Sequence, residues 1–242
     1  MHTKTLFAFT AVLMALMQPT LANDSHKNHA EEHGKQIFHA MRLETDVGAS
    51  RDGTLSTWDL DGWIGGDINK LWLKSEGESL EGKTPERAEY WAMYSRNIAT
   101  FWDGQVGIRY DDKPHSTTYL TAGFNGLAPY NFETEAHLFI SEDGDVTARL
   151  RRESDILITQ KLIAQHYIEI NFAAQDVPEQ EIGAGLTSGE IGLQTRYEIT
   201  RKFAPYVDLR YERKFGETST IAKKHAKNQD DAIASVGLRL MF

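Results

Sequence analysis

The feature that most constrains this chain is a two-residue alternation of apolar side chains that continues to its last residue, Phe242. In the closing segment 231–242, alternate positions hold Ala232, Ala234, Val236, Leu238, Leu240 and Phe242. Every second side chain of a strand lies on the same face, so the alternation predicts a last strand with one fully apolar side. An ordinary half-buried strand of a soluble protein would show the same pattern, so the two possibilities have to be distinguished from the rest of the sequence.

The same alternation recurs from Ile37 onward. It predicts strands at 37–47, 56–66, 67–77, 86–98, 101–111, 117–127, 130–141, 145–155, 161–172, 189–199, 204–214 and 231–242. An even number of about twelve strands, closing on an aromatic residue, is typical of bacterial outer-membrane barrels. The predicted fold class is all-β: a transmembrane antiparallel up-and-down barrel.

Connection lengths favour the barrel over a soluble β-sandwich. Short turns are predicted around Gly66, 98–101, 128–129, 157–160 and 200–204. Longer loops are predicted at the alternate connections, 48–55, 76–86, 111–116, 173–188 and 214–230, with 142–145 as a tight exception. Outer-membrane barrels sort short turns to one side and longer loops to the other, whereas a sandwich has no reason to do so.

The N-terminal residues predict export. Lys4 precedes an apolar run of about a dozen residues and a small residue, Ala22, which is the pattern of a secretory signal peptide. We expect a signal peptide at 1–22, a short disordered arm at 23–35 and a barrel at 36–242, located in the outer membrane of a Gram-negative cell in contact with its lipid.

The amino-acid composition limits the classes of ligand and partner that this chain could bind. The net charge of −9 argues against nucleic acid and suits a cationic partner or a metal ion. The absence of cysteine excludes disulfides and thiolate metal sites. A mean hydropathy of −0.46 is too polar for a helical membrane protein but not for a barrel, in which only alternate side chains face lipid.

Charged side chains gather on the predicted inward face. They are Asp59, Asp61, Lys70, Lys74, Glu76, Glu78, Arg149, Arg151, Glu153, Asp155, Arg196, Glu198, Asp208, Arg210, Glu212 and Arg239. Acid and base are mixed, so one interpretation is a lumen filled by ion pairs, because an unpaired buried charge is costly. The other interpretation is a polar path or binding cavity.

Aromatic residues are predicted to form a girdle at the membrane interfaces, where amphipathic rings prefer to lie. The candidates near strand ends are Trp58, Trp63, Trp72, Trp91, Trp102, Tyr110, Tyr130, Tyr197, Tyr206 and Tyr211.

Several long motifs resemble the bacterial copper resistance protein B family. They include the runs 58–78 (WDLDGWIGGDINKLWLKSEGE), 94–103 (YSRNIATFWD) and 196–206 (RYEITRKFAPY), and the closing GLRLMF. The resemblance extends from about Gly34 to Phe242. It implies an outer-membrane barrel that acts in copper tolerance beside a periplasmic multicopper oxidase, with copper, as Cu(I) or Cu(II), as the bound or transported ion.

The chain departs from the family in its arm. Family members commonly begin with a segment rich in Met, His and Asp, whereas this arm holds His26, His29 and His33 and no methionine precedes Met41 after the signal. Thioethers favour Cu(I), and imidazole also suits Cu(II), zinc and nickel. The three histidines would share one face of a transient helix, and they are either copper ligands or an inert polar leader.

Two further places are candidates for copper ligands. His39 and Met41 are predicted on the lipid-facing side of the first strand, near its periplasmic rim. They form a metal site only if that register is off by one or if this segment is not yet part of the barrel. Glu133, Glu135 and His137 share a predicted lumen face and could present three ligands in a row. The alternative for His137 is a hydrogen bond to a lumen carboxylate.

Two functions compete. The barrel either binds or passes copper itself, or it is a scaffold or passive channel that anchors a periplasmic copper-handling partner without binding metal. An enzyme is not expected, because Ser141 and His137 share a face but lie four residues apart, too far along a strand for direct contact.

Overall fold

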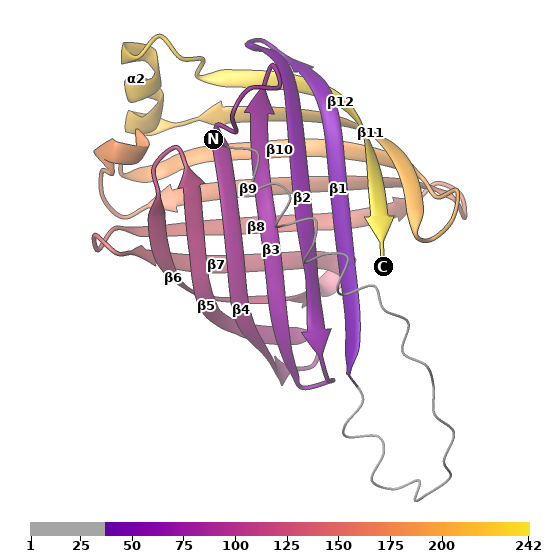
Figure 1. Cartoon of the computed structure of the whole chain (residues 1–242). Coiled ribbons are helices and arrows are strands. Elements are labelled where there is room, and N and C mark those ends of the chain that lie inside the picture. Colours follow the sequence, from indigo (N-terminus) through magenta and orange to yellow (C-terminus); the bar gives the residue numbers. More distant parts are fainter. Residues whose placement is uncertain (1–36) are drawn as a thin grey trace, which may run out of the picture. The chain divides into compact units, whose positions relative to one another are not determined.

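The computed structural model describes residues 37–242, which form a closed antiparallel barrel. Its strands are β1 (Phe38–Ser50), β2 (Gly53–Gly65), β3 (Asn69–Leu80), β4 (Arg87–Ala99), β5 (Trp102–Lys113), β6 (Thr117–Ala128), β7 (Phe132–Ser141), β8 (Val146–Leu157), β9 (Leu162–Ala173), β10 (Gly185–Tyr197), β11 (Phe203–Lys214) and β12 (Asp230–Met241). Each strand pairs with the next one in sequence (Figure 1). The predicted fold is confirmed.

The first and last strands close the barrel. β1 pairs with β12 in a register that places Arg42 opposite Met241 and Ala49 opposite Ala234. At the end of the seam the backbones of Met41 and Phe242 exchange two hydrogen bonds, of 2.9 and 3.0 Å. The backbone hydrogen-bonding groups at the edges of β1 and β12 are thereby paired with each other, and the terminal aromatic residue lies next to the start of β1.

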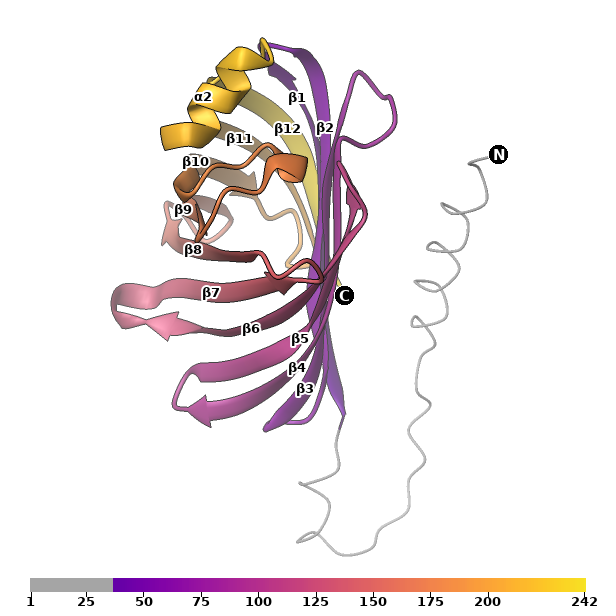
Figure 2. The same ribbon diagram turned by 90° about the vertical axis from the view of Figure 1, so that its left-hand side faces the viewer.

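Some of the observed connections are shorter than the loops predicted from the sequence. β1 and β2 are joined by the tight turn 51–52 rather than by a loop over 48–55, because both strands run on to the turn. The connection predicted at 111–116 shortens to 114–116 for the same reason. The two long connections, 174–184 and 215–229, carry the short helices η3 (Pro178–Gln180) and α2 (Gly216–Lys224), which lie at the same end of the barrel (Figure 2).

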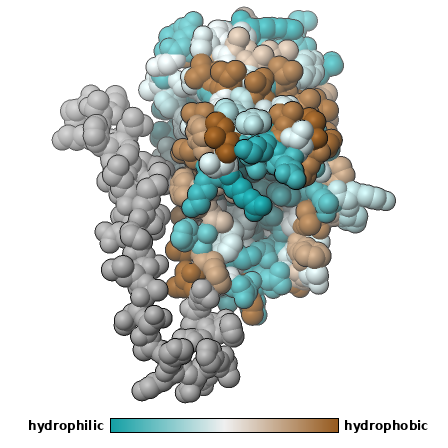
Figure 3. All heavy atoms as spheres, turned by 90° about the vertical axis from the view of Figure 1, so that its right-hand side faces the viewer, coloured by the Kyte–Doolittle hydropathy of each residue, from teal (hydrophilic) through white to brown (hydrophobic). Residues whose placement is uncertain are grey.

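The two faces of the strands differ as the alternation predicts. Exposed apolar side chains such as Val106, Ile108, Leu120 and Leu209 point outward, whereas their strand neighbours Gln105, Arg109 and Asp208 are buried inside. Hydrophilic side chains gather in the middle of the barrel end shown in Figure 3, with hydrophobic ones flanking them. Within residues 37–242, no helix is long and apolar enough to cross a membrane.

Candidate functional site

The lumen has two walls of different composition. The first, which we call the aromatic wall, consists of Trp91, Met93, Tyr119 and Phe139 on β4, β6 and β7, all at most 4% exposed. The Trp91 and Phe139 rings meet edge to face with their centres 5.0 Å apart. Edge-to-face rings pack densely and are favourable beyond the area that they bury, so these side chains form a tightly packed cluster on one side of the lumen.

Arginine 109 completes the aromatic wall. Its guanidinium carbon lies 4.7 Å from the centre of the Phe139 ring and 4.9 Å from that of Tyr119. The same group donates to Asp111 at 2.6 Å and forms an ion pair with Glu89 at 3.1 Å. The planar cation is therefore stacked on rings and paired with carboxylates at once, which leaves no free charge on this wall.

His137 belongs to the aromatic wall and lies on the lumen face, as predicted. Its Nε2 atom is 2.8 Å from the side-chain oxygen of Gln105, and its ring meets Trp91 edge to face. The partner is therefore an amide, not the carboxylate expected for a structural histidine. Glu135 is held elsewhere, by Lys74 and by a 3.3 Å hydrogen bond from Asn125.

The predicted ligands of the barrel do not converge. Glu133 also lies on the lumen face but is exposed, and within residues 37–242 no three metal-ligating side chains come together as a preformed metal site. His39 and Met41 alternate with the lumen residue Arg42 and so point outward, at the start of β1. His26, His29 and His33, like the predicted signal peptide and arm, lie outside the described residues.

Part of the predicted aromatic girdle is wrong. Trp63, Trp72, Trp91 and Tyr206 point into the lumen: Trp72 donates to Asp61, and the Tyr206 hydroxyl donates to Asp46 at 3.1 Å. Side-chain type alone had placed these residues at the interface, although their alternation with outward-facing neighbours indicated the lumen. Trp102, Tyr110 and Tyr211 do point outward.

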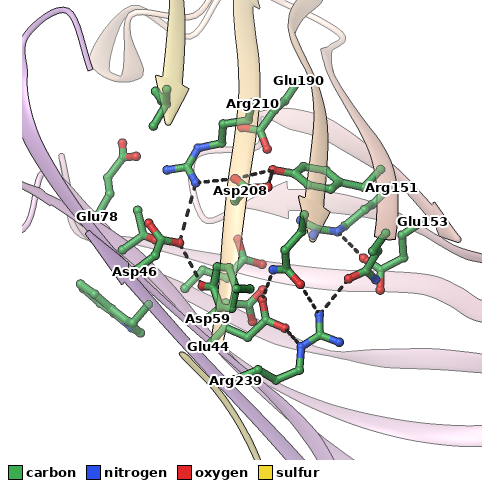
Figure 4. A pocket seen from close by; sticks show the side chains of 18 of the residues that line it. Glu44, Asp46, Asp59, Glu78, Arg151, Glu153, Glu190, Asp208, Arg210 and Arg239 are labelled. Carbon is green, nitrogen blue, oxygen red and sulfur yellow. Dashed lines mark hydrogen bonds and ion pairs between the residues drawn. The ribbon is translucent and has the colours of Figure 1, made fainter. Parts of the chain in front are cut away.

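The second wall encloses a cavity of about 120 Å³, which we call the carboxylate cavity (Figure 4). Strands β1 to β4, β8 and β10 to β12 supply its charged lining: Arg42, Glu44, Asp46, Asp59, Glu76, Glu78, Arg87, Arg151, Glu153, Glu190, Asp208, Arg210, Glu212 and Arg239. Acidic residues outnumber arginines in this lining, in contrast to the aromatic wall.

Ion pairs close one side of the carboxylate cavity. Arg239 pairs with Glu44, and Arg42 pairs with Glu153 at 3.4 Å. These arginines come from the terminal strands β12 and β1, near the seam. Charged pairs across a barrel satisfy each other without help from solvent, so this layer is a floor of ion pairs beneath the cavity.

Four carboxylates of the cavity are not paired. The side chains of Asp59, Glu78, Glu190 and Glu212 take part in no hydrogen bond or ion pair with residues 37–242 (Figure 4 labels the first three). Three of these residues belong to the charged set predicted from the sequence. Glu190 was missed, although it shares its face of β10 with Arg196.

The carboxylate cavity continues toward the loop end of the barrel. Glu78, Arg87 and Glu212 line both the cavity and a wider space of about 890 Å³ bounded by the loops. Across this space, Lys227 and His225 contact Glu181 at 2.6 and 2.8 Å. Hydrogen bonds from Lys227 and His225 hold the pKa of Glu181 below its ordinary value, so an exposed charge cluster ties the two long loops together.

The family model for the copper resistance protein B precursor (CopB) matches residues 36–242. Copper resistance protein B of Escherichia coli is 41% identical over 77% of this chain, and the match spans 63% of that protein. The copper resistance protein B homolog of Pseudomonas syringae pv. tomato is 40% identical over 90% of this chain and 74% of the homolog.

Among solved structures, the NanC porin is similar in fold. It aligns with a TM-score of 0.55 over 82% of this chain and 98% of the porin, at 11% identity. This likeness shows a shared barrel architecture and nothing further. The sequence matches and the barrel together lead to one conclusion: the chain belongs to the copper resistance protein B family.

Proposed function

We propose that this protein crosses the outer membrane and binds copper ions in its carboxylate cavity, which they reach from the loop end. Membership of the family supports a role in copper resistance. The outward apolar face and the polar lumen support a membrane location. The role proposed is binding rather than catalysis.

The observation that carries the proposal is the set of unpaired carboxylates. Asp59, Glu78, Glu190 and Glu212 face one cavity without ion-pair partners among residues 37–242. A charge in a low-dielectric lumen is costly unless it is compensated, and an excess of one sign concentrates ions of the opposite sign. The carboxylates of the lining outnumber its arginines, so a cation in the cavity would complete the compensation.

Ligand chemistry indicates which copper ion the cavity would take. Carboxylate oxygens suit harder cations, whereas thioethers suit Cu(I). We therefore expect Cu(II) rather than Cu(I). Because the carboxylates do not converge as a preformed site, water would share the coordination, and binding would be weak and only modestly selective. The arm histidines His26, His29 and His33 would supply the selectivity that the cavity lacks.

The floor of ion pairs argues for binding rather than free conduction. Arg42 and Arg239 line the side of the cavity away from the loops and are held by Glu153 and Glu44, so a cation that enters from the loops meets a layer of closed ion pairs. Copper held in this way could be passed to a periplasmic multicopper oxidase. That partner is implied by the resemblance to the family and stays a proposal.

Equilibrium dialysis against Cu(II) tests the proposal. The chain from residue 23 and a chain from residue 36 should both bind copper, the shorter one more weakly. Loss of all binding on deletion of 23–35 would place the site in the arm. Absence of binding in both chains would contradict the proposal and favour a scaffold that anchors a copper-handling partner.

A further inference from the structure

Arg87 is the most loosely held arginine of the carboxylate cavity. Its guanidinium lies 4.0 Å from Glu76 and 3.9 Å from Glu89, and it forms no hydrogen bond with residues 37–242. The other arginines of the lining each donate at least one side-chain hydrogen bond: they are Arg42, Arg151, Arg210 and Arg239. Their side chains are 8 to 28% exposed, whereas that of Arg87 is 44% exposed.

The two carboxylates that Arg87 approaches have closer partners. Arg149 lies 3.2 Å from Glu76 and 3.0 Å from Glu89. Arg109 adds a contact of 3.1 Å to Glu89. Because the attraction between opposite charges weakens with distance, Glu76 and Glu89 are compensated mainly by these two arginines. The charge of Arg87 is therefore only partly used by its nearest carboxylates.

Two of the unpaired carboxylates share the opening of the cavity with Arg87. Glu78 is directly opposite Arg87 in the β3–β4 register, so the two side chains leave the sheet on the same face. Glu212 lines the same three spaces as Arg87: the carboxylate cavity, the space bounded by the loops, and a third space of about 250 Å³ beside the aromatic wall. Arg87 thus stands with Glu78 and Glu212 where the cavity opens toward the loops.

We infer that Arg87 is an internal counter-cation of the carboxylate cavity: it competes with a bound copper ion for Glu78 and Glu212 and keeps that ion exchangeable. Arginine stays positively charged at every physiological pH. A copper ion in the cavity is therefore repelled by Arg87 and is attracted by carboxylates whose charge Arg87 already partly offsets. The inference rests on the proposed function, because it concerns how tightly the cavity holds copper.

A purely structural role for Arg87 predicts the opposite result. If Arg87 mainly held β3 and β4 in place through Glu76 and Glu89, its loss would loosen the cavity and weaken copper binding. If Arg87 is a competing cation, its loss strengthens copper binding. The sign of the change in affinity therefore separates the two roles.

Titration of the chain from residue 23 with Cu(II), followed by electron paramagnetic resonance, tests the inference. The oxygen-ligated component of the spectrum reports copper in the cavity, because copper on the arm histidines gives nitrogen splitting. In Arg87→Gln this component should reach half its full intensity at about tenfold less free copper than in the wild type, since one repelling unit charge is removed. Arg87→Lys keeps the charge and should restore the wild-type affinity.

Lys113→Gln is the matched control. Lys113 lines the space bounded by the loops and the third space but not the carboxylate cavity. Its loss removes the same charge at the same end of the barrel, and it should shift the half-point by less than about twofold, because solvent and salt screen charges outside the cavity. Heat-modifiable migration on gels checks that each variant folds, and Arg87→Met replaces Arg87→Gln if the latter does not.

Release of copper to EDTA should also be slower from Arg87→Gln than from the wild type, because affinity differences within one site lie mostly in the dissociation rate. A half-point in folded Arg87→Gln that is unchanged or higher, with the oxygen-ligated component present in the wild type, would overturn the inference and leave the copper proposal standing. Absence of that component from the wild type and from every variant would contradict the proposed function, and the inference with it.

Discussion

Both walls of the lumen carry buried charges, but the two walls differ in how those charges are packed and paired. In the aromatic wall, Arg109 pairs with Glu89 and stacks on the Phe139 and Tyr119 rings. In the carboxylate cavity, Asp59 and Glu190 are not paired, and space remains in front of them. The comparison teaches that charge alone does not make a binding site. A lumen charge can bind a ligand only where packing has left it both uncompensated and accessible.

Removing a ring from the aromatic wall should have the largest effect on stability. Phe139→Ala leaves a cavity between Trp91 and Tyr119 and uncovers Arg109, and it should lower the free energy of unfolding by about 4 kcal/mol. Urea unfolding in lipid vesicles, followed by tryptophan fluorescence, measures the change. Phe124→Ala is the control, because Phe124 points outward and is 45% exposed. Equal losses in both variants would mean that the aromatic wall is not specially packed.

Neutralising the carboxylate cavity should have a smaller effect of the opposite sign. In Asp59→Asn combined with Glu190→Gln, two carboxylates that make no direct ion pair are neutralised in a cavity where acidic residues outnumber arginines. The free energy of unfolding should rise by up to about 1 kcal/mol. The same vesicle assay applies, with the exposed pair Asp67→Asn and Glu179→Gln as the control of equal charge change. Destabilisation by 2 kcal/mol or more, of the order of a broken buried pair, would show that these carboxylates are paired after all.

The smallest expected effect concerns the loops above the cavity. The pKa of Glu181 is held below its ordinary value of 4.5 by Lys227 and His225. The contacts of Glu181 therefore stabilise the folded loops at pH values above 4.5, and this stabilisation is lost as the pH falls through the lowered pKa. Amide exchange over 174–184, corrected for the intrinsic rate, should therefore quicken in acid. Glu181→Gln should remove this pH dependence and Glu179→Gln should keep it. A wild-type loop insensitive to acid would contradict the tether.

Much of the fold could be predicted from the sequence because alternation is a local property. All strands were found within a few residues of their bounds, and the lumen positions of Glu133, Glu135 and His137 followed from the same parity. The contacts across the lumen could not be predicted. Arg42 meets Glu153 and Lys74 meets Glu135, from strands that are far apart in sequence and that face each other only once the tilt and stagger of the closed barrel are set.

The functional residues were harder to predict for the same reason. Whether Asp59 or Asp61 is paired depends on which side chain lies opposite. Asp61 receives hydrogen-bond and ion-pair contacts from Trp72 and Lys74, and Asp59 receives neither kind.

Electron paramagnetic resonance of Cu(II) bound to a chain lacking residues 23–35 tests the central claim most directly. Copper in the carboxylate cavity should give an oxygen-ligated spectrum without nitrogen splitting, and the signal should disappear in Asp59→Asn combined with Glu190→Gln. The exposed Asp67→Asn and Glu179→Gln pair should leave it unchanged. Nitrogen splitting that is lost in His137→Gln, or a signal that survives loss of Asp59 and Glu190, would place the copper elsewhere and contradict the account.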